Sequence, residues 1–522
     1  MNVLTDLAVP LLHDHLLQTA ARLPDKIAVV CKGVYVSYAE MNAASNAFAH
    51  ALVHRGVQRG DRVMVFCDNT VEAAIAFWAV LKANAVVSVV NPLTKADKLA
   101  YLLNDCRAKA LVTDAHLVGV YQAAAERSPH LRAVVVSGSP DEKFMSKLPG
   151  GIGWEAALTG EDRAAPPRRS AIDIDLAAIV YTSGSTGDPK GVMLTHRNML
   201  TAAASVSTYL GLCESDVVLM VLPMAFDYGL YQMIMSFRVG ARLVIERSFA
   251  FPAVVLDVMV KEGVTVFPGV PTIYAVLTEM KSLPNYDLSR IRVVTNTAAA
   301  LPLKHIERLR ELFPAAQIFS MYGLTECKRC TYLPPADLAR KPTSVGIAIP
   351  NTEMWLVDEN HQRLPAGQVG QLVIRGATVM RGYWEKPEAT AKKLRPGPLP
   401  GELVLYTGDY CRMDEEGYLY FVGRMDDIIK SRGEKVAPKE VENAITNIPG
   451  VREAAVIGVP DEVLGQAVKA FVVLEQHATL TEKDIQRECQ RRLENFMVPK
   501  VVVLVDDLPK TTTGKIQKTD LS

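Results

Sequence analysis

The sequence predicts an α/β fold, with a large multi-subdomain N-terminal body of parallel-type sheets covered by helices and a small α+β domain at the C-terminal end. Strand-like and helical segments alternate over most of the 522 residues, which is the pattern of parallel sheets with helices on their faces. No repeat of fixed period is visible, which argues against a solenoid. After residue 424, strands mix with two helices over roughly a hundred residues, the size of a small domain. The predicted domains are therefore residues 1–424 and 425–522.

The elements of the body follow from the period of the apolar residues. Helical periodicity predicts helices at Tyr38–Arg55 and Val71–Lys82, each followed by a short β-rich run, Asp61–Asp68 and Ala85–Val90. Gly138–Asp173 is polar and rich in Pro and Gly, and is predicted to be a surface excursion. Other short apolar runs predict strands at Ala110–Asp114, Leu131–Ser137, Val217–Leu222, Ala241–Glu246, Val264–Pro268, Arg292–Thr295 and Ala316–Phe319.

The same reasoning divides the C-terminal part into five elements. Two helices are predicted, Pro438–Asn447 and Glu482–Leu493. The predicted strands are Glu453–Val459, Val468–Leu474 and Lys500–Val505.

Composition and charge exclude several classes of protein. The 57 basic and 57 acidic side chains give a net charge of zero, so there is no general attraction to nucleic acid or to an anionic membrane. The 8 cysteines are scattered, which indicates a reducing compartment rather than a disulfide framework. The first residues do not have the pattern of a signal peptide, and the apolar stretch Ala73–Val90 is interrupted by polar residues and is not a membrane span. The predicted location is cytoplasmic.

The most informative segment is Ala177–Gly191, AAIVYTSGSTGDPKG. An apolar strand leads into a loop of Thr, Ser and Gly that ends in Pro-Lys-Gly. Glycines let backbone N–H groups approach an anion, hydroxyl groups add donors, and a lysine adds positive charge, so the loop is predicted to bind a polyphosphate. The spacing differs from that of a Walker A loop. The alternative is a flexible polar loop between a strand and a helix.

This segment resembles the signature of the adenylate-forming superfamily, which comprises acyl-CoA synthetases, the adenylation domains of peptide synthetases, and luciferases. Four further motifs resemble those of the superfamily and occur in the expected order along the whole chain. They are Tyr322-Gly323-Leu324-Thr325-Glu326, Tyr406-Thr407-Gly408-Asp409, Gly423-Arg424-Met425-Asp426-Asp427 with Lys430 and Gly433, and Pro509-Lys510-Thr511-Thr512-Thr513-Gly514-Lys515-Ile516.

The resemblance implies an ATP-dependent acid–thiol ligase. Such an enzyme converts a carboxylic acid to an acyl-adenylate with release of pyrophosphate, and then transfers the acyl group to the pantetheine thiol of CoA or of a carrier protein. The resemblance implies ATP and Mg²⁺, an AMP-binding domain at residues 1–424, and a mobile C-terminal domain that carries the catalytic lysine. No nucleic acid or membrane span is expected.

The resemblance also assigns roles to individual residues. Lys515 is the expected catalytic lysine, Glu326 the Mg²⁺ ligand, and Asp426 the hinge about which the small domain rotates to bring Gly433 into a pantetheine tunnel. Tyr322 is expected to stack on adenine, and Asp409 with Arg424 to bind the ribose. The remaining residues expected at the nucleotide are Thr182, Ser183, Gly184, Ser185, Thr186, Gly187, Lys190, Ala298, Ala299 and Thr325.

The acid-binding pocket departs most from the usual pattern of the superfamily. Asp227 stands where amino-acid-activating domains have a carboxylate that pairs with the substrate amine, and a carboxylate in apolar surroundings needs a cation. A substrate amine, Arg238 or Lys328 would serve, so a stand-alone amino-acid adenylation enzyme that loads a carrier protein is the alternative function. The expected pocket residues are Phe226, Asp227, Tyr228, Tyr231, Ala300, Met321, Gly323, Cys327 and Lys328.

The Cys327–Cys330 motif has no second ligand pair, so a zinc or redox role is not expected. We expect this segment to line the acyl pocket, where Lys328 and Arg329 meet an acidic group of the substrate. Two other classes remain as alternatives: a nucleotide-binding pseudoenzyme, against which the joint presence of Lys515, Glu326, Asp409 and Arg424 argues, and a luciferase-like oxygenase.

Overall fold

The structure, a computed structural model, describes residues 11–182, 189–297, 303–431, 434–461, 464–510 and 516–521. The chain divides into two compact units. The first comprises Met1–Leu338, Ala348–Thr352 and Arg375–Leu394, and the second comprises Ala339–Ile347, Glu353–Ile374 and Arg395–Ser522. The α/β class is confirmed, although the sheets are mixed rather than purely parallel. The functional boundary at residue 424 stays a prediction.

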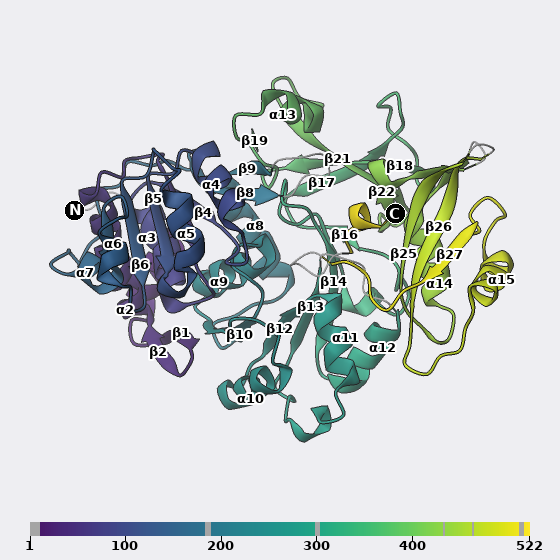
Figure 1. Cartoon of the computed structure of the whole chain (residues 1–522), viewed down its shortest axis with the longest axis horizontal. Coiled ribbons are helices and arrows are strands. Elements are labelled where there is room, and N and C mark those ends of the chain that lie inside the picture. The colour runs from purple at the N-terminus through teal and green to yellow at the C-terminus, as the bar shows by residue number, and fades with distance from the viewer. Residues whose placement is uncertain are drawn as a thin grey trace. The chain divides into compact units, whose positions relative to one another are not determined.

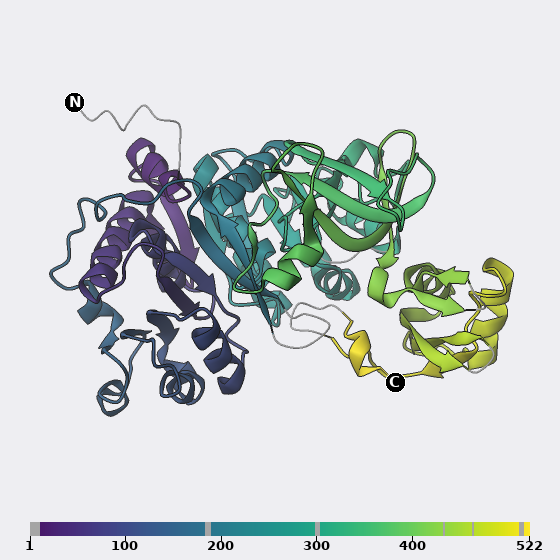
Figure 2. The ribbon, with the colours of Figure 1, turned by 90° about the horizontal axis from the view of Figure 1, so that it is seen from above.

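The first sheet of unit 1 has eight strands, with a parallel centre and an antiparallel edge. Met64 and Phe66 of β3 pack with helices α4 and α5 in one apolar cluster. Val63 and Val65 alternate with them along the strand and point to the opposite face of the sheet, where they are also buried. Helix α3 contacts β3 and β4, and Figures 1 and 2 show helices on both sides of these strands. The strand order is β19 (Gly382–Tyr383), β9 (Lys190–Thr195), β8 (Leu176–Thr182), β4 (Val86–Val89), β3 (Arg62–Phe66), β5 (Ala110–Asp114), β6 (Ala133–Ser137) and β7 (Gly151–Gly153).

The second sheet has nine strands, and its central pairs are again parallel. Helix α9 contacts β10 and β11, and the hydroxyl of Tyr228 on this helix donates to the carbonyl oxygen of Thr295 in β13 at 2.8 Å. The strand order is β16 (Ile347–Ala348), β15 (Thr331–Leu333), β14 (Gln317–Tyr322), β13 (Val293–Asn296), β12 (Val266–Gly269), β10 (Val217–Met220), β11 (Arg242–Ile245), β1 (Ile27–Cys31) and β2 (Val34–Ser37).

Side chains at the N-terminal ends fix where several helices of unit 1 begin. Ser37 and Thr195 form capping boxes with Glu40 and Asn198, which satisfies backbone N–H groups that have no partner within the helix. The helices of unit 1 are α1 (Asp14–Arg22), α2 (Tyr38–His54), α3 (Val71–Lys82), α4 (Ala96–Asp105), α5 (Val118–Ala125), α6 (Glu142–Met145), α7 (Trp154–Leu158), α8 (His196–Tyr209), α9 (Asp227–Val239), α10 (Pro252–Glu262), α11 (Pro271–Glu279), α12 (Leu303–Leu312) and α13 (Pro387–Lys393).

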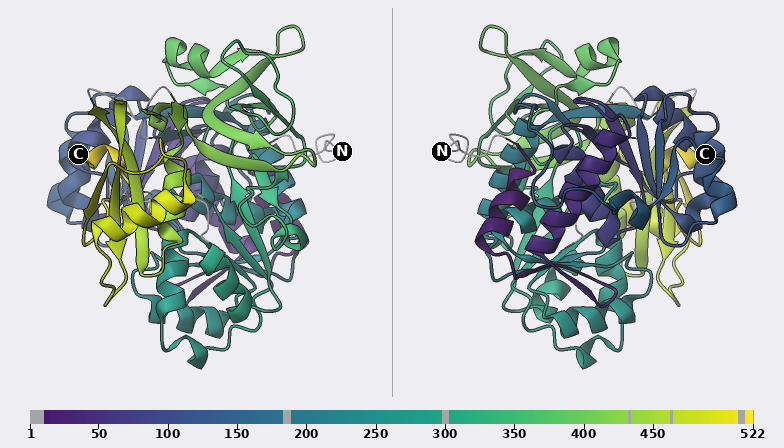
Figure 3. Two further views of the ribbon diagram at one scale, coloured as in Figure 1. Left: turned by 90° about the vertical axis from the view of Figure 1, so that its right-hand side faces the viewer. Right: turned by 90° about the vertical axis from the view of Figure 1, so that its left-hand side faces the viewer.

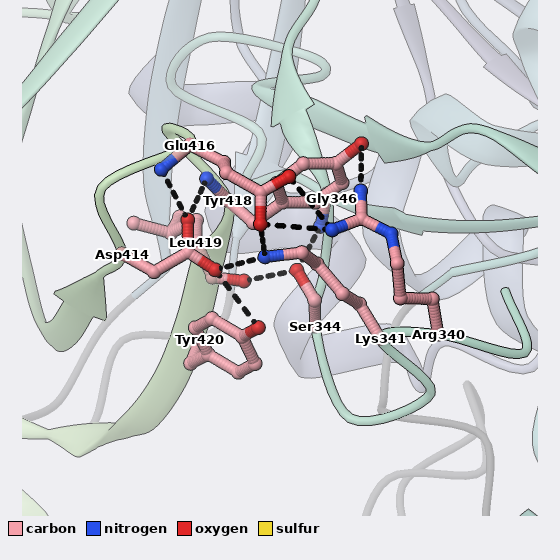
Figure 4. Close-up of polar contacts among 9 residues, drawn as sticks. All are labelled: Arg340, Lys341, Ser344, Gly346, Asp414, Glu416, Tyr418, Leu419 and Tyr420. Carbon is pink, nitrogen blue, oxygen red and sulfur yellow. Dashed lines mark hydrogen bonds and ion pairs between the residues drawn. The ribbon is translucent and has the colours of Figure 1, made fainter. Parts of the chain in front are cut away.

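Unit 2 begins with a five-stranded sheet that contains a long hairpin, β21–β22. Figure 4 shows how the segment 340–346 is attached to the turn of this hairpin by ion pairs and hydrogen bonds. The ammonium of Lys341 contacts the carboxylates of Asp414 and Glu416, and these hydrogen bonds raise the pKa of Lys341. Ser344 donates to the carbonyl oxygen of Leu419 at 2.8 Å. The strands are β17 (Thr352–Val357), β18 (Val369–Gly376), β20 (Leu394–Pro396), β21 (Leu403–Met413) and β22 (Leu419–Arg424).

The other sheet of unit 2 is built from strands β23 (Ile429–Ser431), β24 (Glu434–Val436), β25 (Val451–Asp461), β26 (Gly465–Leu474) and β27 (Val501–Leu504). Alternate residues divide it into two apolar faces. Val456 and Val472 pack with α14 (Pro438–Thr446) and α15 (Glu482–Arg492), both seen in Figure 3. Ala455 and Phe471 pack on the opposite side with Leu508.

Most predicted elements are confirmed to within a few residues, and two features differ. Gly138–Asp173 is not only a surface excursion, because β7 forms the edge of the eight-stranded sheet and Trp154 is buried against Phe48. The loop predicted to bind phosphate connects β8 to a second, antiparallel strand, β9, which the sequence did not predict. Among the described residues, no helix combines the length and the apolar character that crossing a membrane requires.

Candidate active site

The segment predicted to bind phosphate joins two antiparallel strands, β8 and β9. Thr182 at the end of β8 pairs with Lys190 at the start of β9, so the two strands hold both ends of the loop in register. Both residues are half-buried. The loop positions Ser183, Gly184, Ser185, Thr186 and Gly187 lie outside the described residues.

Tyr383 connects the phosphate loop to the predicted metal ligand. It lies in β19, which pairs with β9, and it is 5% exposed. Its hydroxyl donates to Oε1 of Glu326 at 2.7 Å, and the ammonium of Lys190 lies 5.8 Å from the centroid of its ring. Residues 190, 326 and 383 therefore meet within unit 1. Tyr383 was not predicted from the sequence, because a strand of two residues has no recognisable period.

The segment from Tyr322 to Glu326 follows β14 and depends on a glycine. A Cβ atom at Gly323 would lie 2.6 Å from the carbonyl oxygen of Lys328 and 2.9 Å from the Cα of Arg329. These are backbone atoms, so a larger residue forces the chain apart. Glu326 itself is fixed on its main chain, because its carbonyl oxygen accepts from the N–H of Met380 at 2.7 Å. Of the other predicted residues, Met321 is buried and Tyr322 and Thr325 are half-buried.

A strained turn follows Glu326. The N–H of Arg329 donates to the carbonyl oxygen of Cys327 at 2.8 Å, and Lys328 between them has a φ of 61°. This is a γ-turn with a left-handed central residue, which is rare and costly for a residue other than glycine. The Sγ atoms of Cys327 and Cys330 lie 2.9 Å apart as free thiols. Among the described residues, they belong to no group of three or more metal-ligand side chains.

The turn directs Lys328 to the start of α9. Its ammonium lies 3.3 Å from Oδ2 of Asp227, donates to the carbonyl oxygen of Asp227 at 2.7 Å, and lies 4.1 Å from the centroid of the Tyr231 ring. Burial lowers the pKa of Lys328 to about 7, while the carboxylate of Asp227 acts in the opposite direction. The cation that Asp227 needs is therefore supplied by the protein. Phe226 and Tyr228 flank Asp227 at the same end of α9.

Asp409 and Arg424 face each other across the β21–β22 hairpin of unit 2. Oδ1 of Asp409 lies 3.7 Å from Nε of Arg424, and the arginine side chain is 59% exposed while that of Asp409 is 7% exposed. The intervening Gly408 has a φ of 80°, which favours glycine between Thr407 and Asp409. Asp426 follows in a short 3₁₀ helix, Met425–Asp427. The predicted residues Ala298, Ala299, Ala300, Gly433 and Lys515 lie outside the described residues.

Comparison with known proteins identifies the family. The model of the AMP-binding enzyme family matches residues 16–384, and that of the AMP-binding enzyme C-terminal domain matches residues 440–515. The chain belongs to the AMP-binding enzyme family. It is 32% identical over 530 residues to a long-chain-fatty-acid–CoA ligase of Escherichia coli O6:H1, covering 97% of this chain and 92% of that protein.

Two solved structures of AMP-binding enzymes are similar along nearly the whole chain. ATP-bound MatB from Rhodopseudomonas palustris matches with a TM-score of 0.87 and 31% identity, covering 98% of both chains. The anthranilate CoA ligase AuaEII, in complex with anthranoyl-AMP, matches with a TM-score of 0.89 and 28% identity, covering 99% of this chain and 98% of that chain. The protein is an AMP-forming acid–thiol ligase, and the use of ATP and CoA follows from its family.

The AMP-binding enzyme has one obvious cluster of cation-binding side chains in its described part, and that cluster is already satisfied. Asp68, Asp114 and His116 have ligand atoms within 4.8 Å of one another. However, Asp68 pairs with Arg247 at 2.9 Å, and Asp114 accepts from the hydroxyl of Ser137 at 2.6 Å. These contacts explain the cluster without a metal ion.

Lys328 makes the stability of the enzyme depend on pH. Below pH 7 the ammonium of Lys328 is charged in both the folded and the unfolded state. The full free-energy cost of burying this charge then lowers the stability of the folded protein. Above pH 7 the folded protein releases the proton, whereas the unfolded chain keeps it up to about pH 10.5. Compared with Lys328→Met, the wild type should therefore gain up to about 1.4 kcal/mol of unfolding free energy per pH unit between 7 and 9.

Urea unfolding of both proteins at pH 6, 7.5 and 9 measures this difference. Lys500→Met is the control, because Lys500 is 57% exposed in its pair with Asp461 and should show no such trend. Parallel pH profiles for wild type and Lys328→Met would contradict the lowered pKa.

Proposed function

We propose that the enzyme is an acyl-CoA synthetase that works in two half-reactions. In the first, a carboxylate oxygen of the acid attacks the α-phosphorus of ATP, and pyrophosphate leaves to give the acyl-adenylate. In the second, the CoA thiol attacks the acyl carbonyl, and AMP leaves. The observation that supports this most directly is Tyr383, which contacts both Glu326 and Lys190 and so joins the phosphate loop to an acidic side chain.

Joining two anions requires nearby positive charge. Lys190, the loop residues Ser183–Gly187 and Thr182, and Thr325 would hold the phosphates, and Lys515 would bridge the acid and the α-phosphate. Glu326 suits a Mg²⁺ ion, because its carboxylate accepts a hydrogen bond from the neutral hydroxyl of Tyr383 and Mg²⁺ is commonly bound by one or two carboxylates together with substrate phosphates. A bound Mg²⁺ supplies charge that offsets the repulsion between acid and phosphates.

A further set of predicted residues would bind the adenosine part of ATP. Tyr322 would stack on the adenine, with Ala298 and Ala299 beside the nucleotide. The carboxylate of Asp409 would accept from both ribose hydroxyls, with the exposed Arg424 assisting. Asp409 is well suited to this task, because the hairpin register and the pairing with Arg424 fix its position.

The acid would lie along the start of α9 and the turn after Glu326. Ala300, Met321, Gly323 and Cys327 would complete this pocket. Because the Nζ atom of Lys328 already lies 3.3 Å from Oδ2 of Asp227, that carboxylate is occupied by the protein, and the pocket does not favour a substrate amine there. An amino-acid adenylation enzyme that loads a carrier protein is therefore the less favoured alternative, and CoA is the acceptor that the names of the relatives support.

The C-terminal domain, residues 425–522, would move between the two half-reactions. Rotation about Asp426 would take Lys515 away from the acyl-adenylate and bring Gly433 to the thiol tunnel. Domain rotations of this kind often limit turnover, and they depend on a few hinge residues that absorb the backbone change.

An acid panel tests the proposed activity. We expect ATP–pyrophosphate exchange with at least one acid from a panel of fatty, aryl, α-amino and β-amino acids, followed by thioester formation with CoA. Lys515→Ala should lower the exchange by roughly 100-fold or more, because it removes a positive charge from the developing negative charge. Exchange with amino acids and thioester formation only on a holo carrier protein would favour the alternative, whereas no exchange with any acid would indicate a nucleotide-binding pseudoenzyme.

Tyr383 is expected to orient Glu326 for Mg²⁺. Tyr383→Phe should raise the Mg²⁺ concentration required for half-maximal exchange by roughly 10- to 100-fold, the usual effect of losing a hydrogen bond to a metal ligand. Tyr35→Phe is the matched control, because the hydroxyl of Tyr35 also donates to a glutamate, Glu262, at 2.7 Å but lies outside the site. An unchanged Mg²⁺ dependence in Tyr383→Phe would show that Glu326 does not need this bond.

The hinge is tested by a substitution that restricts its backbone. Asp426→Pro fixes φ and removes an N–H group, so it should spare ATP–pyrophosphate exchange more than thioester formation. The two rates are measured on the same preparation. Equal losses in both half-reactions would contradict a rotation about Asp426.

A further inference from the structure

Arg329 is a buried cation for which the described residues supply no anionic partner. The residue is 2% exposed, and its Nε atom has no hydrogen-bond partner. Within the part of the chain that the structure describes, its guanidinium makes neither a hydrogen bond nor an ion pair. Its one close side-chain contact of an electrostatic kind is the ring of Tyr228, whose centroid lies 5.1 Å from the guanidinium carbon.

The neighbours of Arg329 do not supply the missing negative charge. Lys328, the adjacent residue, is a second cation and already occupies the carboxylate of Asp227. Tyr209, Tyr228 and Tyr231 are close enough for the charge of Arg329 to affect them, but burial raises the pKa of each hydroxyl, so all three are neutral. The hydroxyl of Tyr209 donates to Sδ of Met321 and that of Tyr228 to Thr295.

An unpaired buried guanidinium is strongly unfavourable, because it loses its hydration without gaining an acceptor. The backbone adds strain at the same place, since Arg329 follows the left-handed Lys328 in the γ-turn. Strain and unpaired charge persist in a fold where function selects for them. The arrangement is therefore explained by a ligand that brings an anion to Arg329.

The position of Arg329 indicates which molecule brings this anion. It is three residues beyond Glu326, and its Cα packs against Gly323 in the same segment. Its guanidinium lies over Tyr228 at the start of α9, where the proposed function places the acid. Guanidinium groups bind planar carboxylates through two parallel hydrogen bonds. A second carboxylate on the acid itself satisfies these conditions.

We infer that Arg329 binds the distal carboxylate of the substrate, and hence that the enzyme activates a dicarboxylic acid. This inference rests on the proposed function, because it takes the acid to lie beside α9. One carboxylate is activated on the side of Glu326, and the other remains ionised and paired with Arg329. Arg329 is thus a specificity-determining residue that contacts substrate away from the reacting atoms.

Matched acids test the inference. Saturated dicarboxylates of three to ten carbons are each compared with the monocarboxylate of the same carbon number, together with phthalate isomers against benzoate. We expect kcat/KM for AMP formation with the best dicarboxylate to exceed that of its monocarboxylate by roughly 10- to 100-fold, the usual effect of hydrogen bonds to a charged group. Arg329→Met should remove or reverse this preference, and Arg329→Lys should restore part of it.

A second measurement does not depend on activity. The midpoint of thermal unfolding of ligand-free Arg329→Met should be higher than that of the wild type, because the unpaired charge is gone. The best dicarboxylate, with ATP omitted, should stabilise the wild type but not this variant. Arg238→Met is the control, because the Nε of Arg238 donates to the hydroxyl of Ser207 at 3.2 Å. This variant should prefer dicarboxylates over monocarboxylates to the same extent as the wild type.

The outcomes separate the two proposals. A wild type that prefers monocarboxylates, with a preference that Arg329→Met leaves unchanged, would overturn the inference and leave the acyl-CoA synthetase intact. AMP formation with no acid would contradict the proposed function and with it the activation of a dicarboxylic acid, and the binding measurement would then test only whether Arg329 binds a dicarboxylate. No stabilisation of the wild type by any dicarboxylate in that case would overturn the inference too.

Discussion

The candidate site depends on the sharp return of the chain after Glu326, where two adjacent cations are buried within one turn. The return is possible because Gly323 leaves room for the backbone of Lys328 and Arg329. It is held by the N–H of Cys330, which donates to the carbonyl oxygen of Tyr322 at 3.0 Å. Without this return, Lys328 would not reach Asp227, and Asp227 would be a carboxylate without a counter-charge among buried apolar side chains.

A second constraint joins elements that are far apart along the chain. The short strand β19 pairs with β9 and thereby places Tyr383 between Lys190 and Glu326. The tyrosine ring and hydroxyl have different roles in this arrangement: the ring faces Lys190 and the hydroxyl meets a carboxylate. One side chain thus contacts both a cation, Lys190, and an anion, Glu326.

How much of the structure can be predicted from the sequence depends on how far apart along the chain the interacting residues lie. Buried strands such as Ala110–Asp114 and buried helices such as Val71–Lys82 are determined by local apolar patterns and were predicted with the bounds that the structure shows. Strand β7 and strand β19 were missed, because each is only two or three residues long and exists through pairing with a distant strand. The Thr, Ser and Gly loop suggested phosphate binding by its chemistry, but its place in a hairpin required knowledge of β9.

The surroundings of Asp227 show the same limit for a charge interaction between distant residues. The cost of burying a carboxylate predicted, from the sequence alone, that Asp227 needs a nearby cation. The sequence did not distinguish among Arg238, Lys328 and a substrate amine as that cation. Lys328 is 101 residues away along the chain, so only the fold could select it. Lys328 contacts the carboxylate of Asp227, whereas no anionic side chain among the described residues pairs with Arg329. A protein that needed only to bury an apolar acid would gain stability by replacing Arg329 with an apolar residue of similar size, and the retention of the charge is therefore best understood as recognition of an anion.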